Sequence, residues 1–370
     1  MSADTKDFQD LRAEVQDKGI CCRCGGCVAF CSAGEFNALR TGDDGAPVME
    51  DESRCLHCGV CYLICPQVKA LDGELRRKTG WKAPIGPCRR LLSARATSRK
   101  VRQVATDGGA VTALLAYALK KHLIQAAIVS RRVGPLAREP MVATSPEELI
   151  EAAGSHFDES RPVHAVGTQY TSFSPGVREV KSLGRRDLAR IALVGTPCQI
   201  FTIKKMQLLS VLPADSIVLT VGLFCMENFT FDARTRRALE KRLPVKLGQI
   251  RKLNIKDDIV VTTAKKETVH IPFSVMDEFA RPACFACTDF ANEHADLSCG
   301  GIGSPDGYTS LVLRTTAGEA LYNRAKEDGA IEELRFRSPD DRRNAGTEMM
   351  AKIVAATRRK QARAAKRMEG

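Results

Sequence analysis

A repeated cysteine spacing near the start of the chain constrains the fold more than any other feature. Each copy has the pattern Cys-x2-Cys-x2-Cys-x3-Cys, and the two copies are formed by Cys21, Cys24, Cys27 and Cys31 and by Cys55, Cys58, Cys61 and Cys65. Three thiolates on one tight loop can each bind one iron of a 4Fe-4S cubane, while the fourth iron is reached from elsewhere in the chain. Zinc sites usually take two cysteines from each of two short loops, which this spacing does not offer. The pattern therefore predicts two 4Fe-4S clusters and the transfer of one electron at a time.

The two copies together have the pattern of a bacterial two-cluster ferredoxin, in which the fourth cysteine of each copy binds the cluster of the other. We therefore expect one cluster on Cys21, Cys24, Cys27 and Cys65 and the other on Cys31, Cys55, Cys58 and Cys61. Cys22 is an extra thiol beside a predicted ligand, so an exchange of Cys22 for Cys21 stays open. Ser32 stands where a proline often follows the fourth cysteine, which leaves the number of ligands unchanged.

The composition indicates a globular protein without a targeting or membrane-spanning segment. Of its 370 residues, 44% are hydrophobic and 27% are charged, and no apolar run reaches the roughly 18 residues that a membrane-spanning helix needs. The first twenty residues mix acids with bases and lack the apolar core of a secretory signal. We therefore expect a cytoplasmic protein whose fifteen cysteines serve as metal ligands rather than disulfides.

The net charge of +12 is concentrated in two places, Arg89 to Arg102 and the tail from Arg342 to Arg367. A basic tail of this kind is typical of a solvated helix or a docking arm. Because no aromatic residues alternate with its charges, we do not expect it to bind nucleic acid.

Four of the six remaining cysteines have contexts that suit a further metal site. Cys198 follows an apolar segment and Pro197, so we expect it at the start of a helix, where the helix dipole favours a thiolate. Cys225 ends another apolar segment, and a loop carries the Cys-x2-Cys pair Cys284 and Cys287. From spacing alone, a four-thiolate site and isolated buried cysteines both stay open. The other two cysteines have no partner pattern and are expected to be structural or free thiols: Cys88 and Cys299.

Beyond the cysteine repeat, a charged linker over 76–87 leads into alternating helices and strands. We expect helices over 109–122, 146–153, 197–209 and 231–242, and strands over 126–133, 190–195, 216–224 and within 249–272. This alternation predicts an α/β or α+β domain. The domain boundaries that follow are 1–80 for the ferredoxin-like domain, 85–330 for the second domain and 331–370 for a basic helical tail.

Two glycine-containing turns before helices could receive a phosphate. Gly108-Gly109, with Thr112 in the helix that follows, is one, and Gly195-Thr196 is the other. Backbone N–H groups at such helix starts bind pyrophosphate, as in many flavin sites. Glycines before helices are also ordinary caps, so each turn by itself leaves both interpretations open.

Several motifs together resemble the family of coenzyme F420 hydrogenase/dehydrogenase beta subunits over roughly residues 85 to 330. They are Gly108-Gly109-x2-Thr112, Ala152-Ala153-Gly154-Ser155, Val194-Gly195-Thr196-Pro197-Cys198-Gln199, Gly222-Leu223-Phe224-Cys225-Met226-Glu227-Asn228, Cys284-x2-Cys287-x-Asp289-Phe290 and Ala295-Asp296-Leu297-Ser298. With the ferredoxin-like repeat in front, the chain is most similar to the electron-input subunit of reduced coenzyme F420 dehydrogenases.

The resemblance implies an α+β protein: a two-cluster ferredoxin domain, a mixed α/β flavin-binding domain and a basic helical tail. It implies FAD bound near Gly108, Gly109, Thr112, Gly154, Ser155, Gly195 and Thr196, and a third 4Fe-4S cluster on Cys198, Cys225, Cys284 and Cys287. The chain departs from the family at Cys299-Gly300-Gly301, which leaves Cys299 as a rival ligand.

The implied activity is oxidation of reduced coenzyme F420 by hydride transfer to FAD, which can take two electrons together and release them singly to the clusters. No side chain is then required as a general acid, general base or nucleophile. The electrons would pass to a partner redox complex, which could include a membrane complex to which the protein docks. Two alternatives stay open: a ferredoxin-dependent flavin reductase of another substrate such as a tetrapyrrole, and a pure electron-transfer subunit.

Overall fold

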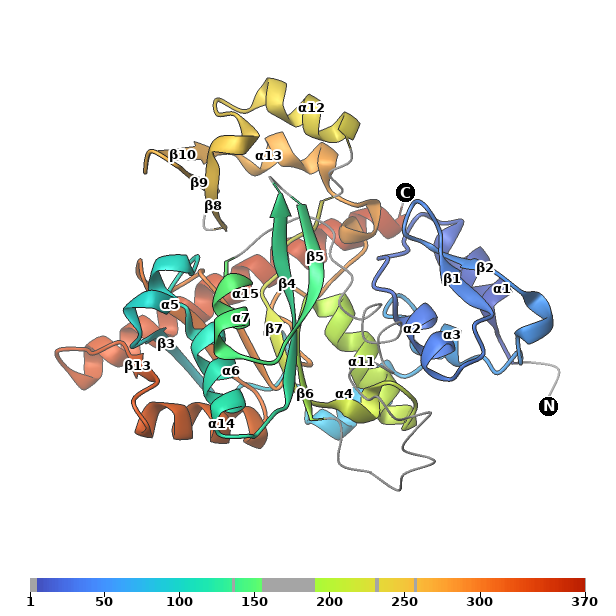
Figure 1. The fold of residues 1–370 in the computed structure, drawn as a ribbon, viewed down its shortest axis with the longest axis horizontal. Coiled ribbons are helices and arrows are strands. Elements are labelled where there is room, and N and C mark those ends of the chain that lie inside the picture. The colour runs from blue at the N-terminus through green and yellow to red at the C-terminus, as the bar shows by residue number, and fades with distance from the viewer. Residues whose placement is uncertain (1–4, 135–136, 155–189, 230–232, 256–257, 370) are drawn as a thin grey trace.

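The computed structural model describes residues 5–134, 137–154, 190–229, 233–255 and 258–369. Figure 1 shows three parts: an N-terminal lobe of short elements, a central sheet with helices around it, and a small lobe of three strands beside α12 (Ala233–Arg242) and α13 (Phe273–Met276).

The N-terminal lobe contains both copies of the cysteine repeat. Its elements are α1 (Phe8–Leu11), η1 (Arg12–Gln16), α2 (Gly26–Ala33), β1 (Leu39–Thr41), β2 (Pro47–Met49), η2 (Glu52–Arg54), α3 (Val60–Leu63) and α4 (Asp72–Thr79). The helices α2 and α3 start in the same way, because Gly25 and Gly59 precede them with φ values of 81° and 73°. Glycine adopts this left-handed conformation at little cost, which lets the loop turn sharply after the second cysteine of each copy.

The central sheet has eight strands in the order β13-β3-β12-β11-β7-β6-β4-β5. Their bounds are β3 (Arg90–Ala96), β4 (Ala126–Gly134), β5 (Ala137–Ala143), β6 (Ile191–Gly195), β7 (Ile217–Leu223), β11 (Leu297–Gly300), β12 (Thr309–Leu313) and β13 (Ile331–Glu333). The four strands β4, β6, β7 and β11 are parallel neighbours, and the outer pairs are antiparallel. Ligands of such sheets usually bind beyond the carboxyl ends of the parallel strands.

Alternate residues of the strands pack against different helices on the two faces of the sheet. One face carries α6 (Ala110–Lys120), α7 (Pro146–Glu151) and α14 (Thr316–Glu327) over residues such as Ala192 and Leu311. The other carries α11 (Pro197–Leu209) over Ile128 and Leu193, and α15 (Pro339–Glu369) over Val312. The helix α5 (Arg99–Val104) packs at the side of α6. Both faces are therefore covered, as expected for a largely parallel sheet.

The N-terminal lobe shares its core with the central sheet through α11. Ala29 of α2 and Ile64 pack in the same apolar cluster as Ile200 and Ile203. Gly26 faces Thr202 so closely that an added Cβ would lie 2.1 Å from the threonine Cγ2. A side chain at residue 26 would therefore push the lobe away from α11.

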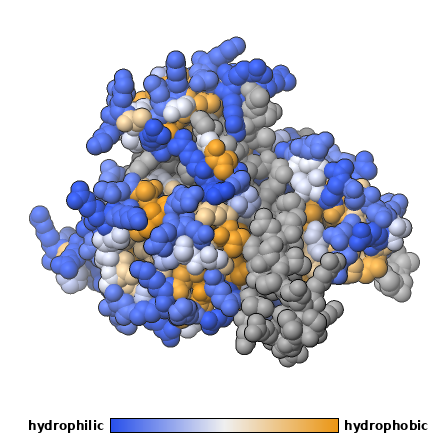
Figure 2. Space-filling model, in the orientation of Figure 1, coloured by the Kyte–Doolittle hydropathy of each residue, from blue (hydrophilic) through white to orange (hydrophobic). Residues whose placement is uncertain are grey.

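The small lobe is inserted between β7 and β11. It contains the sheet β10-β9-β8, with bounds Thr268–Ile271, Ile259–Thr263 and Ile250–Ile255, and its own apolar core around Phe229, Val261 and Phe279. Figure 2 shows that the surface of this lobe is mostly hydrophilic in that view.

The mixed α/β sheet agrees with the expected fold class, and the elements expected between residues 109 and 272 lie within a few residues of their predicted bounds. The segment 331–370, which we set apart as a tail, begins with β13, which pairs with β3, so the sheet continues across residue 330. Two arginines of the basic segment 89–102 face C-terminal acids: Arg89 contacts Glu319 at 2.7 Å and Arg95 contacts Glu332 at 2.6 Å. Within the described ranges, every helix is too short or too polar to cross a membrane.

Candidate cluster and cofactor sites

The cysteines of the N-terminal lobe line two separate cavities. Cys21, Cys24, Cys27 and Cys65 line the first, together with Cys22 and Cys61. Cys31, Cys55, Cys58 and Cys61 line the second. Each set contains three cysteines of one copy and the fourth cysteine of the other, which is the exchange expected for two 4Fe-4S clusters.

Burial raises the pKa of Cys21 to about 11 and the pKa of both Cys61 and Cys65 to about 12. These thiols would stay protonated at neutral pH without a metal, and binding of iron would release their protons. Among the described residues, no three metal-binding side chains converge on a single point as ligands of one ion. A cubane distributes its four thiolates over four irons, so it does not require such convergence.

Cys22 lies between the set to which its neighbour Cys21 belongs and Cys198. Its thiol contacts the sulfur of Cys198, on the central sheet, as well as that of Cys24. The hydrogen bond from Cys22, supported by Arg281 and Thr196, lowers the pKa of Cys198 to about 5 against the effect of burial. The Arg281 guanidinium is itself buried and donates to the Cys22 carbonyl oxygen at 2.6 Å. Cys22 and Arg281 thus lie where the N-terminal lobe meets Cys198.

The four other predicted ligands come together at the carboxyl ends of β6 and β7. Cys198 is the second residue of α11, which starts with Pro197 after the capping residue Thr196. Cys225 follows β7, Cys284 lies in η6 (Pro282–Phe285), and Cys287 follows η6. Burial, together with the neighbouring sulfur atoms, raises the pKa of both Cys225 and Cys287. The Asn228 backbone N–H donates to the Cys284 sulfur at 3.3 Å, which is the kind of contact that stabilises a thiolate.

The end of α15 reaches this third set, which sequence reasoning did not anticipate. Lys360 donates to the carbonyl oxygens of Cys225 at 2.6 Å and Asp289 at 2.8 Å. Arg363 donates to the Glu227 carboxylate at 2.6 Å and to the Met226 carbonyl oxygen at 3.0 Å. The only signal in the sequence was that Lys360 continues the apolar stripe of the helix, formed by Met349, Ile353, Ala356 and Ala364.

A cavity of about 220 Å³ opens beyond the carboxyl ends of β6, β7 and β11. Five of the seven residues predicted to bind FAD line it: Gly109, Thr112, Gly154, Gly195 and Thr196. Gly108 instead packs on β3 and β12, where its N–H donates to the Thr309 hydroxyl at 3.1 Å. Ser155 lies outside the described residues. Sites for small molecules typically have volumes of roughly 300–1,000 Å³, so a whole dinucleotide would extend out of this cavity.

The wall of the cavity combines apolar and polar groups suited to a ring system. Phe224, Phe290 and Ile302 contribute apolar surface, and Glu227 contributes a carboxylate. Burial raises the pKa of Glu227 despite its contact with Arg363, and its Oε1 has no hydrogen-bond partner. This oxygen is itself inaccessible to water, so it faces protein rather than the open cavity, and leaving it unpaired is costly.

The two remaining cysteines are apart from the third set. Cys299 lies in β11 at the cavity wall, with its sulfur 3.5 Å from the Gly222 carbonyl oxygen. Burial and Asp107 raise the pKa of Cys299 to about 12. Cys88 is exposed. Neither contacts the sulfur atoms of Cys198, Cys225, Cys284 or Cys287 in the described structure.

Asn292 holds the strand ends that carry Cys198 and Cys225. Its side-chain amide donates to the carbonyl oxygens of Gly195 at 2.9 Å and Leu223 at 3.2 Å. An added Cβ at Gly222 would lie 2.3 Å from the Asn292 Cγ, so only glycine leaves room for this bridge. The bridge aligns β6 with β7 at the edge where the cavity meets the third set.

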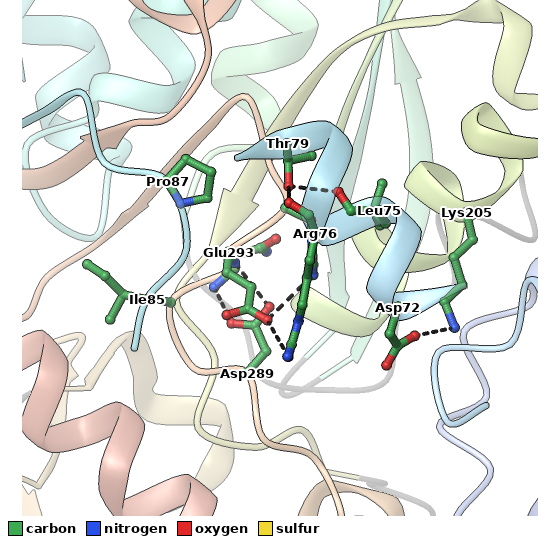
Figure 3. Close-up of polar contacts among 12 residues, drawn as sticks. Asp72, Leu75, Arg76, Thr79, Ile85, Pro87, Lys205, Asp289 and Glu293 are labelled. Atoms are coloured by element: carbon green, nitrogen blue, oxygen red, sulfur yellow. Dashed lines mark hydrogen bonds and ion pairs between the residues drawn. The ribbon is translucent and has the colours of Figure 1, made fainter. Parts of the chain in front are cut away.

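The expected linker is anchored to the sheet domain rather than free. Its first residues belong to α4, and Figure 3 shows polar contacts at both ends of this helix. Asp72 contacts Lys205 of α11 at 3.0 Å, and Arg76 contacts Glu293 at 3.9 Å. Arg76 also stacks on Trp81. These contacts limit the freedom of the N-terminal lobe relative to α11.

Comparison with known proteins follows the same division of the chain. The family of coenzyme F420 hydrogenase/dehydrogenase beta subunits is described in two parts, and both match this chain. Residues 91–166 match the N-terminal part, and residues 188–338 match the C-terminal part. The N-terminal lobe and α15 lie outside both matched segments.

Individual relatives cover different shares of the chain. The beta subunit of the coenzyme F420 hydrogenase of Methanothermobacter thermautotrophicus is 34% identical over 67% of this chain and 85% of its own length. One of the subunits of the F(420)H(2) dehydrogenase of Methanosarcina mazei is 26% identical over 94% of this chain and 92% of its own length. A chain of the F420-reducing [NiFe] hydrogenase complex from Methanosarcina barkeri, solved as a xenon derivative, superposes with a TM-score of 0.59 at 28% identity, covering 74% of this chain and 92% of that one.

Proposed function

This chain belongs to the family of coenzyme F420 hydrogenase/dehydrogenase beta subunits, and from this premise we propose that it oxidises reduced coenzyme F420 and delivers single electrons to a partner. A bound flavin would supply the conversion between hydride transfer and one-electron transfer. The three cysteine sets would hold 4Fe-4S clusters. We expect the reaction in the cytoplasm, with a partner redox complex as acceptor and no role in nucleic-acid binding.

The observation that carries this proposal is that the cavity and the third cysteine set share Cys225. Cys225 lines the cavity directly after β7, and its neighbours in the fold are Cys198, Cys284 and Cys287. A ring bound in the cavity would therefore be adjacent to a cluster bound by these cysteines. Short separations of this kind favour electron transfer without any moving part.

The helix α11 supports the next step of the route. Cys198, Thr202 and Lys205 follow one another at intervals of four and three residues, which places them on one face of the helix. Thr202 lies 3.4 Å from the Cys24 sulfur, and Lys205 donates to the Cys65 carbonyl oxygen at 2.9 Å. One rigid helix thus connects the third set with the set formed by Cys21, Cys24, Cys27 and Cys65. The set containing Cys58, which is exposed, would then be the last before the partner.

The residues of the chain would act by binding and alignment rather than by acid–base chemistry. Gly109 and Thr196 stand at helix starts on the cavity wall, where N–H groups favour a phosphate. Coenzyme F420 carries a phosphate and a glutamate tail, so the basic residues of the flavin domain would favour its approach.

The proposal is tested by mixing the purified, iron-reconstituted protein anaerobically with reduced coenzyme F420 and methyl viologen. We expect oxidation of the coenzyme together with reduction of the dye, bound FAD, and about twelve irons per chain for three cubanes. A Cys225→Ser variant should reduce its flavin but deliver electrons at least tenfold more slowly. Cys88→Ser is the matched control, because Cys88 is exposed and apart from the sets.

Absence of coenzyme oxidation despite bound FAD and full iron would exclude coenzyme F420 as the substrate. A ferredoxin-driven flavin reductase would then explain the same cofactors. Purified protein with full iron that cannot bind FAD would instead indicate a pure electron-transfer subunit.

A further inference from the structure

In the described part of the chain, a buried cation that forms no ion pair lies beside the third cysteine set. Lys360 is only 1% exposed, although it belongs to the basic tail. Among the described contacts, its ammonium donates to two backbone carbonyl oxygens, those of Cys225 and Asp289. The nearby Arg363 differs, because it forms an ion pair with Glu227 at 2.6 Å. Lys360 is therefore held by dipoles rather than by a carboxylate.

Burial of an unpaired ammonium is unfavourable unless negative charge lies close to it. The two acceptors of Lys360 belong to Cys225, a predicted ligand, and to Asp289, two residues after the predicted ligand Cys287. A cluster bound by the third cysteine set would therefore place its negative charge beside the buried ammonium. Lys360 is fixed there by α15, which packs on the sheet through Met349, Ile353 and Ala356.

A cluster with four thiolate ligands has a net negative charge, and reduction adds one more electron to it. Net charge, hydrogen bonding and solvent exposure are the factors that set the potential of such a cluster. A positive charge held nearby stabilises the reduced form more than the oxidised form, and a buried location strengthens this effect because little water screens it.

Building on the proposed function, we propose that Lys360 raises the reduction potential of a 4Fe-4S cluster bound by Cys198, Cys225, Cys284 and Cys287. In this role the lysine acts through space on the cluster and touches neither substrate nor flavin. The step concerned is the gain of one electron by the oxidised cluster from the reduced flavin; no bond is made or broken and the lysine keeps its proton. The tail helix would thus be part of the electron-transfer machinery.

The test is a redox titration of the reconstituted holoprotein, followed by EPR and by the visible absorbance of the clusters. Lys360→Met removes the charge in a side chain of similar length, and Lys360→Gln removes the charge but keeps an N–H donor for the carbonyl oxygens. We expect both to shift the midpoint of one cluster to a more negative potential and to leave the other two unchanged. Lys360→Arg should keep the wild-type midpoint.

Arg358→Met is the matched control, because Arg358 is an exposed cation of the same helix, two residues away. It should leave all three midpoints unchanged. Wild-type midpoints in both neutral variants would overturn the proposal, and so would a shift in Lys360→Gln no larger than that in Arg358→Met. If the neutral variants do not retain the third cluster, the iron content of Lys360→Arg decides. Full iron in Lys360→Arg would support a role for the positive charge, and loss of about four irons in Lys360→Arg would overturn the proposal.

The titration uses dithionite and dyes, so it does not depend on coenzyme F420. If the coenzyme is not oxidised but the midpoint shifts, the proposed substrate fails and the role of Lys360 stands. If the coenzyme is oxidised and no midpoint shifts, the role of Lys360 fails by itself.

Discussion

Cys21 and Cys22 are adjacent in the sequence and have the same side chain, but their sulfur atoms have different surroundings. The sulfur of Cys21 interacts with those of Cys27 and Cys65, whereas the sulfur of Cys22 contacts Cys198. We therefore expect Cys21→Ala to lose about four of about twelve irons per chain, and Cys22→Ala to keep them all. Measurement of the iron-to-protein ratio, with EPR of the reduced protein, checks both.

The two variants act as controls for each other, since each removes one sulfur atom from the same loop. Equal iron loss in both would contradict the prediction. Loss in Cys22→Ala alone would make Cys22 a ligand and would return Cys21 to the role of an extra thiol.

The spacing of the cysteines predicted the sets in the N-terminal lobe, because a short loop fixes the positions of the ligands that it carries relative to one another. It could not predict the burial of Lys360, whose hydrogen-bond acceptor Cys225 lies 135 residues away in the sequence. In a basic helix, one lysine on the apolar stripe looks like its solvated neighbours until the packing partner is known. The unpaired oxygen of Glu227 was hidden for the same reason.

At the scale of elements, α11 links the two parts of the chain that carry cysteine sets. Lys205 is fully buried and donates to the carbonyl oxygens of Cys65 and Val68, and it contacts Asp72 of α4 at 3.0 Å. Lys205→Met would leave these acceptors without their buried donor. We expect a loss of about 1–3 kcal/mol in the free energy of unfolding, measured by denaturant titration of the cluster absorbance.

Lys120→Met is the control, because Lys120 is an exposed lysine at the end of α6. Its effect should stay within about 0.5 kcal/mol. Equal denaturation midpoints for Lys205→Met and the wild type would show that the lysine does not hold the lobe on α11.

The bounds of α11 were predictable from its sequence, since Pro197 favours the first turn and Thr196 caps it. The element against which α11 packs was not predictable from the sequence. The contact of Gly26 with Thr202 depends on how α2 and α11 meet in their shared core, and neither segment has a periodicity that specifies the other.

The order of the whole sheet was less predictable than its elements. The strand β11 pairs with β7 across the inserted small lobe, and β3 pairs with β12 and β13 from the end of the chain. Such short strands, joined by distant contacts, leave little trace in local patterns. The family resemblance predicted the cofactors. It could not predict the contact of α15 with the third cysteine set, because this helix lies beyond the segments that match the family.

Charge is also divided unevenly over the whole molecule. Residues 1–60 contain eleven Asp and Glu but six Lys and Arg, whereas the complete chain has a net charge of +12. Exposed acids lie close in the sequence to the set formed by Cys31, Cys55, Cys58 and Cys61. They include Glu35, Asp51 and Glu52, and the apolar side chain of Leu56 is also exposed there. An acidic surface attracts cationic acceptors and repels anionic ones, and salt screens both effects.

We therefore expect the dithionite-reduced protein to transfer electrons to methyl viologen, a cation, more slowly as salt is added, and to ferricyanide, an anion, more rapidly. Stopped-flow measurement from low to high ionic strength checks this. Glu52→Lys should flatten both dependences, because it reverses one exposed charge in η2, the turn that leads directly into Cys55. Glu327→Lys makes the same change at an exposed residue of α14, across the molecule from the N-terminal lobe in Figure 1, and should leave the slopes as in the wild type. Equal slopes in the two variants would mean that electrons leave elsewhere, and the exit would then have to be sought on the basic part of the chain.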